Sequence, residues 1–176
     1  MIYGFLDSPV GRLLLARDTA GVRMIHFNGP AKTGPYVPRK AGPYVRRPGW
    51  ERHDRAFDDV ATQLTEYFEG RRRAFELPLA PEGTPFQLRV WNALLDIPYG
   101  ETISYGELAG RIGDRSASRA VGLANGSNPL SIVIPCHRVI GSNGKLIGYG
   151  GGLAVKQQLL TLERGGRDLF DQCGRT

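Results

Sequence analysis

One cysteine and one histidine stand side by side after an apolar run, at Cys136 and His137. A thiol with a pKa of about 8.5 is only slightly ionised at neutral pH, so a nucleophilic cysteine needs a base or a positive field nearby. Neighbours on a strand point to opposite faces, but Pro135 favours a turn, in which a water could join thiol and imidazole. Glu163 could supply the carboxylate that orients the imidazole. Two interpretations stay open: an activated nucleophile, or an inert buried cysteine beside a solvent-facing histidine.

A second stretch, 117–125, predicts a helix with an interior of small residues. These residues are Ala117, Ala120, Gly122 and Ala124, with Arg119 among them. A glycine inside a helix costs roughly 1 kcal/mol relative to alanine, so it is expected where something approaches the backbone closely. Tight packing on a neighbouring helix would explain the pattern. A helix pressed into a narrow nucleic-acid groove, with Arg119 reaching into the base stack, would explain it too.

Composition narrows the class of protein that can hold these residues. The chain has 176 residues, 41% of them hydrophobic, enough for one compact domain or two small ones and too apolar for wholesale disorder. Its two cysteines, Cys136 and Cys173, form no disulfide framework and fit a reducing intracellular compartment, so we expect a cytoplasmic protein, or a nuclear one in a eukaryote. We find no signal peptide and no stretch of about 18 apolar residues. A net charge of +6 weakly favours a polyanionic partner.

The first half of the chain predicts a small sheet and one helix. Residues 1–27 contain three short apolar runs separated by turn residues. Residues 28–52 form a loop rich in glycine, proline and basic residues, with a near-repeat at 34–40 and 42–48; a surface loop and a basic arm touching DNA both fit it. Apolar residues then recur at helical spacing over 54–69, ending at Gly70, and we expect this helix to cover the sheet. We place the first domain at 1–80, followed by a linker.

The second half, 84–165, predicts mainly helices, followed by a tail at 166–176. Thr84 and Pro85 begin a helix that ends before Pro98. Ser104 and Glu107 form a capping box for a helix that ends at Gly113, and Ser116 caps the helix that ends at Gly126, so the two make a helix-turn-helix. Residues 130–134 predict a short buried strand, and 153–163 a final helix with its leucines mostly inward. The fold class is α/β (α+β): a small N-terminal antiparallel β-sheet plus helix domain, then a mostly helical, winged-helix-like C-terminal domain.

Several segments of this second half resemble one family. "PCHRV" at 135–139 closely resembles the active-site signature of the O6-alkylguanine-DNA alkyltransferases, also called methylated-DNA–protein-cysteine methyltransferases. "GTPFQLRVWNALLDIPYGETISYGELA", "SRAVGLANGSNP" and "GYGGGLAVKQQLL" are similar to the same family, in the same order. The resemblance runs from about Gly83 to Glu163, whereas the N-terminal half resembles the family only in its layout.

The resemblance implies a chemistry for the cysteine. Cys136 would accept an alkyl group from O6 of a damaged guanine and be consumed, because a thioether has no easy leaving chemistry. His137 would take the thiol proton through a water, and Glu163 would orient the imidazole. Further residues would brace the cysteine loop or donate hydrogen bonds to the guanine as negative charge moves onto it; they are Asn128, Tyr105, Tyr149, Lys156 and the backbone near Cys136 and Gly150. The glycines at 148–152 would let the backbone close over a flat base.

The resemblance also implies double-stranded DNA containing O6-alkylguanine as the partner. The damaged base would be flipped out of the duplex, with Arg119 filling its place and Tyr105 crowding the neighbouring phosphate. The small-residue helix would lie in the minor groove. The expected DNA- or substrate-binding residues are Arg119, Tyr105, Ser104, Ala120, Gly122, Ala124, Arg138 and Gly150. We predict no metal and no cofactor, because no cysteine precedes Cys136 and the N-terminal histidines are only His26 and His53.

Three other functions fit parts of this sequence less well. A lesion-recognition protein of the alkyltransferase-like type would bind the base without accepting the alkyl group, but such relatives lack the thiol. A cysteine hydrolase would turn over and need no DNA, and a plain DNA-binding regulator needs no thiol. We expect a monomer, with cooperative assembly along DNA left open. The preferred alkyl group, activity on O4-alkylthymine, the near-repeat and Cys173 are also left open; Gly150, where relatives commonly carry a slightly larger residue, suggests a wider pocket.

Overall fold

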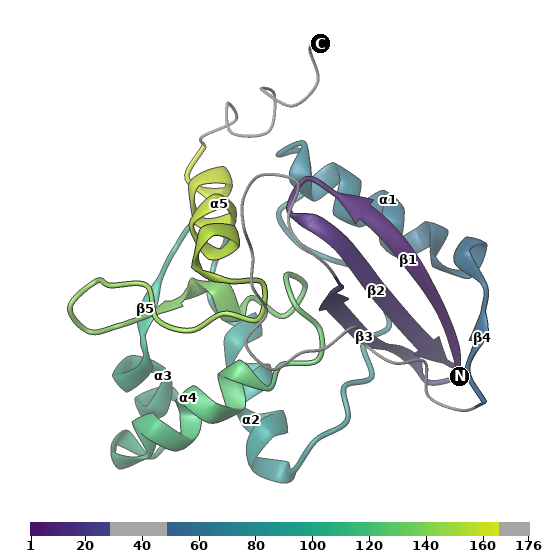
Figure 1. Cartoon of the computed structure of the whole chain (residues 1–176). Coiled ribbons are helices and arrows are strands. Elements are labelled where there is room, and N and C mark those ends of the chain that lie inside the picture. Colours follow the sequence, from purple (N-terminus) through teal and green to yellow (C-terminus); the bar gives the residue numbers. More distant parts are fainter. Residues whose placement is uncertain (29–48, 166–176) are drawn as a thin grey trace.

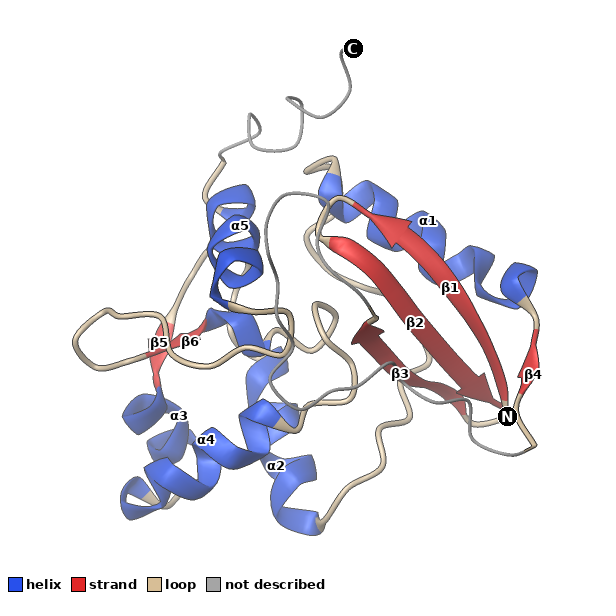
Figure 2. Ribbon diagram, in the orientation of Figure 1, coloured by secondary structure: helices blue, strands red, loops and turns tan. Residues whose placement is uncertain are grey.

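The computed structural model describes residues 1–28 and 49–165, and its first part is a four-stranded sheet (Figures 1 and 2). The strands are β1 (Ile2–Ser8), β2 (Gly11–Asp18), β3 (Gly21–Phe27) and β4 (Glu51–Arg52), in the order β3-β2-β1-β4. The first three are antiparallel neighbours, and β4 runs parallel to β1. The three strands expected over 1–27 are therefore confirmed. The near-repeat at 34–48 and Cys173 lie outside the described residues.

A helix covers this sheet, as expected. A 3₁₀ turn (η1, Asp54–Phe57) leads into α1 (Asp58–Phe68), which lies behind the sheet in Figure 1. Its apolar stripe is buried, with Val60 and Leu64 fully enclosed. Arg17 of β2 fixes the start of the helix by donating to the Ala56 carbonyl and to Asp59, each at 2.9 Å. The helix thereby presents its C-terminal end, including Tyr67, to the rest of the molecule.

The second part is mainly helical. Its elements are α2 (Pro85–Leu95), β5 (Ile103–Ser104), α3 (Tyr105–Arg111), η2 (Arg115–Ala117), α4 (Ser118–Gly126), η3 (Cys136–Arg138), β6 (Val139–Ile140) and α5 (Leu153–Glu163). The predicted capping box forms at Ser104, and Thr84 caps α2 as predicted, with a reciprocal bond from Gln87 that was not predicted. Ser116 does not cap α4, because Asp114 caps the intervening 3₁₀ turn and accepts from both the Ser116 amide and hydroxyl. A two-stranded parallel pairing of β5 with β6 was not predicted.

The strand predicted at 130–134 was wrong. These residues are buried, but they form a turn in which the Ile134 amide bonds back to the Leu130 carbonyl at 2.9 Å. The side chain of Asn128 satisfies both ends of the turn: Oδ1 accepts from the Leu130 amide, and Nδ2 donates to the Ile134 carbonyl. Local partners therefore replace a strand ladder, because burial requires only that backbone polar groups are paired. Leu153, expected inward on α5, is 48% exposed.

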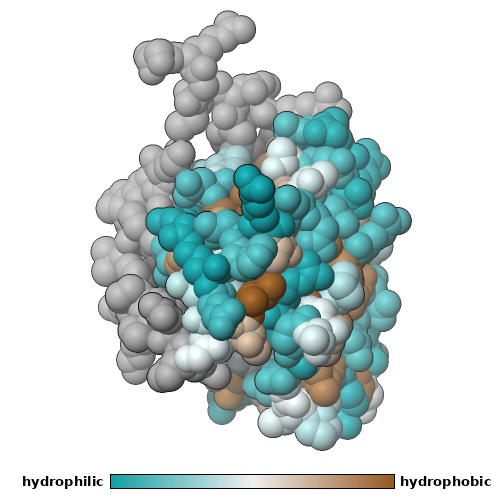
Figure 3. All heavy atoms as spheres, turned by 90° about the vertical axis from the view of Figure 1, so that its right-hand side faces the viewer, coloured by the Kyte–Doolittle hydropathy of each residue, from teal (hydrophilic) through white to brown (hydrophobic). Residues whose placement is uncertain are grey.

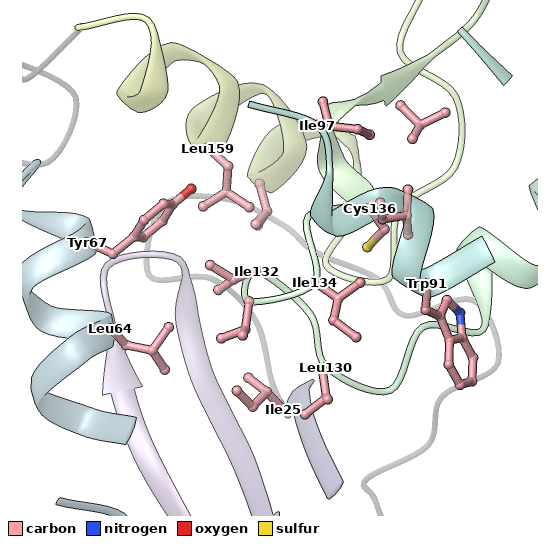
Figure 4. Close-up of a cluster of buried hydrophobic side chains, with 14 of the residues drawn as sticks. Ile25, Leu64, Tyr67, Trp91, Ile97, Leu130, Ile132, Ile134, Cys136 and Leu159 are labelled. Atoms are coloured by element: carbon pink, nitrogen blue, oxygen red, sulfur yellow. The ribbon is translucent and has the colours of Figure 1, made fainter. Parts of the chain in front are cut away.

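One continuous core joins the two parts (Figure 4). Ile25 of β3 pairs with Leu130 as an isolated parallel bridge, and both side chains are buried in the same cluster as Trp91 and Cys136. The side of the molecule that carries β1, β4 and α1 is mostly hydrophilic, with scattered apolar residues (Figure 3). Within the described ranges, no helix is both long and apolar enough to cross a bilayer.

Candidate active site

Cys136 begins the short 3₁₀ turn η3, directly after the buried 130–134 turn. Pro135 has backbone angles φ −82 and ψ 61, so the chain turns here instead of extending. This turn was predicted from the presence of proline at position 135. The cysteine is only 5% exposed and lies among core residues (Figure 4). Burial raises the pKa of its thiol, although a hydrogen bond from Asn128 and the charge of Lys156 oppose that effect. The resting group is therefore a thiol that needs a base before it can act as a nucleophile.

His137 is fully buried and is held by Glu163. The distance from His137 Nε2 to Glu163 Oε1 is 2.8 Å, and an ionised carboxylate only accepts, so Nε2 carries the proton. Nδ1 has no hydrogen-bond partner among the described residues. Burial lowers the pKa of His137, against the opposing effect of Glu163. A neutral imidazole with a free lone pair on Nδ1 is the form that can accept a proton.

Glu163 is the centre of a buried network. Oε1 accepts from Tyr67 Oη at 2.7 Å, His137 Nε2 at 2.8 Å and Arg138 Nη2 at 2.9 Å. Oε2 accepts from Arg138 Nε at 2.8 Å and from the Gly100 amide at 3.1 Å. Gly100 has φ +82, and a Cβ there would lie 3.0 Å from the Glu163 carbonyl oxygen, so glycine suits this close approach. Burial alone would raise the pKa of Glu163, but the bonds and charges of His137 and Arg138 outweigh it and hold that pKa well below its usual value.

Lys156 ties together the segments around the cysteine. Its ammonium donates to the carbonyls of Val139 at 2.6 Å, Ile147 at 2.8 Å and Gly148 at 3.4 Å. Burial lowers the pKa of Lys156 to about 8, against the effect of nearby Cys136. The lysine thus fixes the start of the glycine-dense loop, a bracing position of the kind that the family resemblance implies.

A cavity of about 790 Å³ opens between α4 and the 147–150 loop. Its lining comprises Tyr105, Ser118, Arg119, Gly122, Leu123, Asn125, Gly126, Ile147, Gly148, Tyr149 and Gly150. Cys136 does not line it but lies next to the lining, because Asn125 Nδ2 bonds to the Cys136 carbonyl at 3.4 Å. Tyr105 Oη donates to the Ile147 carbonyl at 3.2 Å, whereas the buried Tyr149 Oη has no partner within the described residues. The predicted tyrosines and glycines therefore surround one hollow beside the thiol.

The glycines of this cavity leave room in it. A Cβ on Gly122 would make only an ordinary contact with the Tyr105 ring, at 3.8 Å, and a Cβ on Gly150 would meet no atom within 4 Å. A side chain at either position would therefore occupy cavity space without displacing protein. The wider pocket suggested by glycine at 150 stays a prediction.

The outer face of α4 is exposed and carries Arg119 and Ala120. Leu123, which the sequence did not single out, is 78% exposed on the same helix. Ser104 is half-buried, and its hydroxyl caps α3 by accepting from the Glu107 amide. Arg119 and Leu123 also line the cavity, whereas Ser104 lines a separate hollow on α3 together with Glu107 and Arg111.

Two expected DNA- or substrate-binding residues are corrected. Arg138 is 6% exposed, pairs with Glu163 and donates to the Ile97 carbonyl at 2.6 Å, so it belongs to the buried network and cannot reach a phosphate. Ala124 is 3% exposed and faces inward, where its carbonyl accepts from Trp91 Nε1 at 2.8 Å. Both were expected from the family resemblance, which does not say on which side of the backbone a side chain lies.

Two buried polar residues, one bonded to Glu163 and one to the Cys136 backbone, were missed. Tyr67 lies in the apolar stripe of α1, and nothing local distinguishes its hydroxyl as a partner of Glu163. Asn125 is buried beside the Cys136 carbonyl, and its Oδ1 has no partner in the described part of the chain. A polar residue on the inner face of a predicted helix was the available signal for Asn125. Among described residues, no three His, Cys, Asp or Glu side chains gather as a metal site requires.

Comparisons with known proteins cover nearly the whole chain. Residues 1–81 match the ribonuclease-like domain of 6-O-methylguanine DNA methyltransferase, and residues 85–165 match its DNA binding domain. The resemblance therefore includes the sequence of the N-terminal half, beyond the layout alone.

Individual relatives agree with these matches. A methylated-DNA–protein-cysteine methyltransferase of Methanosarcina acetivorans is 48% identical over 93% of this chain and 98% of its own. One of Mycolicibacterium paratuberculosis is 51% identical over 92% of each chain. The crystal structure of Mycobacterium tuberculosis OGT in complex with DNA superposes with a TM-score of 0.82 at 44% identity, covering 94% of each chain. The chain belongs to the 6-O-methylguanine DNA methyltransferase family.

Proposed function

We propose that this chain repairs DNA by moving the alkyl group of O6-alkylguanine irreversibly onto Cys136. The observation that carries the proposal is the buried Cys136–His137–Glu163 arrangement beside a cavity of about 790 Å³. A thiol and a neutral imidazole are the two groups that an alkyl transfer to sulfur requires. The relatives named as methylated-DNA–protein-cysteine methyltransferases support the same reaction.

In the proposed reaction, His137 accepts the thiol proton at Nδ1 through a bridging water, while Glu163 holds the imidazole at Nε2. The thiolate attacks the alkyl carbon as the bond from that carbon to O6 breaks, and the electron pair stays on the guanine. Tyr149 Oη, which has no partner among the described residues, would donate to that developing charge, and Tyr105 Oη would exchange its bond to the Ile147 carbonyl for one to the base. The product is a thioether, whose carbon–sulfur bond is not readily broken, so each molecule acts once.

The DNA arrangement is part of the same proposal. A thiol beside a cavity cannot reach a base inside a duplex, so the base must be flipped out at a cost of a few kcal/mol. The exposed face of α4 would lie in the minor groove, with Arg119 occupying the space that the base leaves. Gly122 keeps that side of the cavity open. The solved DNA complex of the Mycobacterium tuberculosis relative supports DNA as the partner.

We also propose a division of labour along the chain. Residues 84–165 would bind DNA and carry the reaction, while residues 1–80 would support the buried network from behind. The protein would act as a monomer on DNA, inside the cell. Asn128 and Lys156 would brace the cysteine and the glycine loop, as their hydrogen bonds to the Leu130, Ile134, Val139 and Ile147 backbone indicate.

Mass spectrometry of the intact protein tests the proposal. Wild type and Cys136→Ser are incubated with a duplex oligonucleotide containing O6-methylguanine. We expect wild type alone to gain one methyl group per molecule, on the peptide that contains Cys136. Tight lesion binding without a mass gain would indicate a recognition protein instead, and repeated turnover would indicate a hydrolase. The absence of both a mass gain and lesion binding would refute the proposed function.

A further inference from the structure

We infer that Tyr67, on the helix that covers the N-terminal sheet, is a positioning residue for the transfer reaction, acting through Glu163. This inference rests on the proposed function. Tyr67 Oη donates to Glu163 Oε1 at 2.7 Å, across 96 positions of sequence. Oε1 is also the oxygen that holds His137 Nε2. The first half of the chain would therefore contribute a hydroxyl to the proton relay of the second.

The tyrosine is held in one orientation. Its ring is fully buried and packs against Phe68, Phe75 and Tyr99, with ring centroids 5.5, 5.4 and 6.1 Å away. In Figure 4 the hydroxyl points away from the sheet, toward α5. Burial and the charge of Glu163 raise the pKa of Tyr67 well above its ordinary value, so the group remains a donor at any pH the protein meets. The hydroxyl proton therefore stays in the hydrogen bond to the Glu163 carboxylate.

The hydroxyl competes for the oxygen that orients the imidazole. Oε1 accepts from Tyr67, His137 and Arg138, and each donor draws electron density from it. Without the tyrosine hydroxyl, Oε1 becomes a stronger acceptor for His137 Nε2–H and favours the protonated imidazole more. A protonated imidazole cannot accept the thiol proton. Tyr67 therefore keeps His137 available as a base, in addition to fixing the plane of the carboxylate.

Among the other charged and titratable groups around the relay, Tyr149 and Arg138 interact with Tyr67 only through electrostatics and accept no hydrogen bond from its hydroxyl. His137 is faced by Glu163 and Arg138, by Lys156 from α5, by Cys136 and by the ring of Tyr149, whose centroid is 6.3 Å away. Tyr149 also senses the charge of Glu163. Because none of these groups contacts Tyr67 as a hydrogen-bond partner except Glu163, a change that follows Tyr67→Phe is attributable to that one bond.

The test measures the single-turnover rate of methyl transfer from an O6-methylguanine duplex for wild type and Tyr67→Phe, from about pH 5 to about pH 9, the range over which histidine titrates. The midpoint of the acid limb is expected to rise by about half a unit to one unit, so the rate below it falls about three- to tenfold. At the alkaline end the two proteins should agree within about twofold. A merely structural role would lower the rate by the same factor at every pH, and this result or an unchanged profile overturns the inference.

Two further variants make the result specific. Tyr3→Phe removes a tyrosine hydroxyl from the same half of the chain, where the ring packs on Phe5 and Trp50, and its profile should overlay that of wild type. In a Glu163→Gln background, Tyr67→Phe should no longer shift the midpoint, because the acceptor through which it acts has lost its charge. A shift that persists there overturns the inference. If wild type takes up no methyl group at all, the proposed function itself fails, and this outcome is distinct from a failure of the inference about Tyr67.

Discussion

Replacing Glu163 by glutamine keeps the shape of the side chain and removes its charge. The carboxylate accepts five hydrogen bonds, two of them from the Arg138 guanidinium, which is itself buried. A glutamine can accept at only one end, and its amide would face a donor at the other. Breaking one partner of a buried ion pair typically costs about 3–5 kcal/mol, because the remaining charge is left uncompensated. We expect Glu163→Gln to lower the free energy of unfolding at neutral pH by about that amount.

The pH dependence of stability gives a second measure of the same residue. The folded pKa of Glu163 lies well below the unfolded value of 4.5, so its stabilisation is fully present above pH 4.5 and is lost as the pH falls toward the folded value. His137 adds to the slope in the same direction, because its folded pKa is also lowered and its buried neutral form loses stability below pH 6.5. Between about pH 5 and about pH 3, wild type should therefore lose more stability than Glu163→Gln.

Urea unfolding of three proteins provides the assay: wild type, Glu163→Gln, and Glu163→Gln with Arg138→Met. Removing the pair as a whole should recover most of the loss, short of about 1 kcal/mol for the Ile97 carbonyl that Arg138 also satisfies. Methyl transfer should stay about 10²- to 10⁴-fold slow in both variants, since neither holds the imidazole with a charge. A single variant that loses less than about 1 kcal/mol at neutral pH would refute the assignment of a buried, charged network.

Two other substitutions separate the binding of DNA from the structural support of the 147–150 loop. Arg119→Ala should leave the urea unfolding midpoint unchanged, because the side chain is exposed. The same change should slow methyl transfer from duplex DNA about tenfold or more but leave transfer from single-stranded DNA unchanged, because no base need be flipped there. Equal losses of rate on both substrates would contradict the proposed role of Arg119. Lys156→Met removes the donor to the Val139, Ile147 and Gly148 carbonyls, and should cost about 1–3 kcal/mol and speed amide hydrogen exchange in the 147–150 loop. Unaltered exchange there would show that the loop is held by other contacts.

Much of the architecture could be predicted because it depends on neighbours in the chain. The strands over 1–27 follow from short apolar runs between turn residues, and α2 and α3 begin where Thr84 and Ser104 can cap them. The position of Cys136 in a turn follows from Pro135. Such features involve contacts a few residues apart, which the local pattern of residue types specifies almost completely.

The burial of polar groups was decided only by the tertiary structure. Arg138 follows His137 directly, yet its guanidinium turns inward because Glu163, 25 positions later, offers a buried carboxylate. Tyr67 belongs to an ordinary apolar stripe until the sheet and α1 bring its hydroxyl to the same carboxylate. The sequence by itself determined which residues could do the chemistry and the order of the elements that hold them. The fold decided which charges are removed from water, because a buried charge is stable only where long-range packing brings its partners to it.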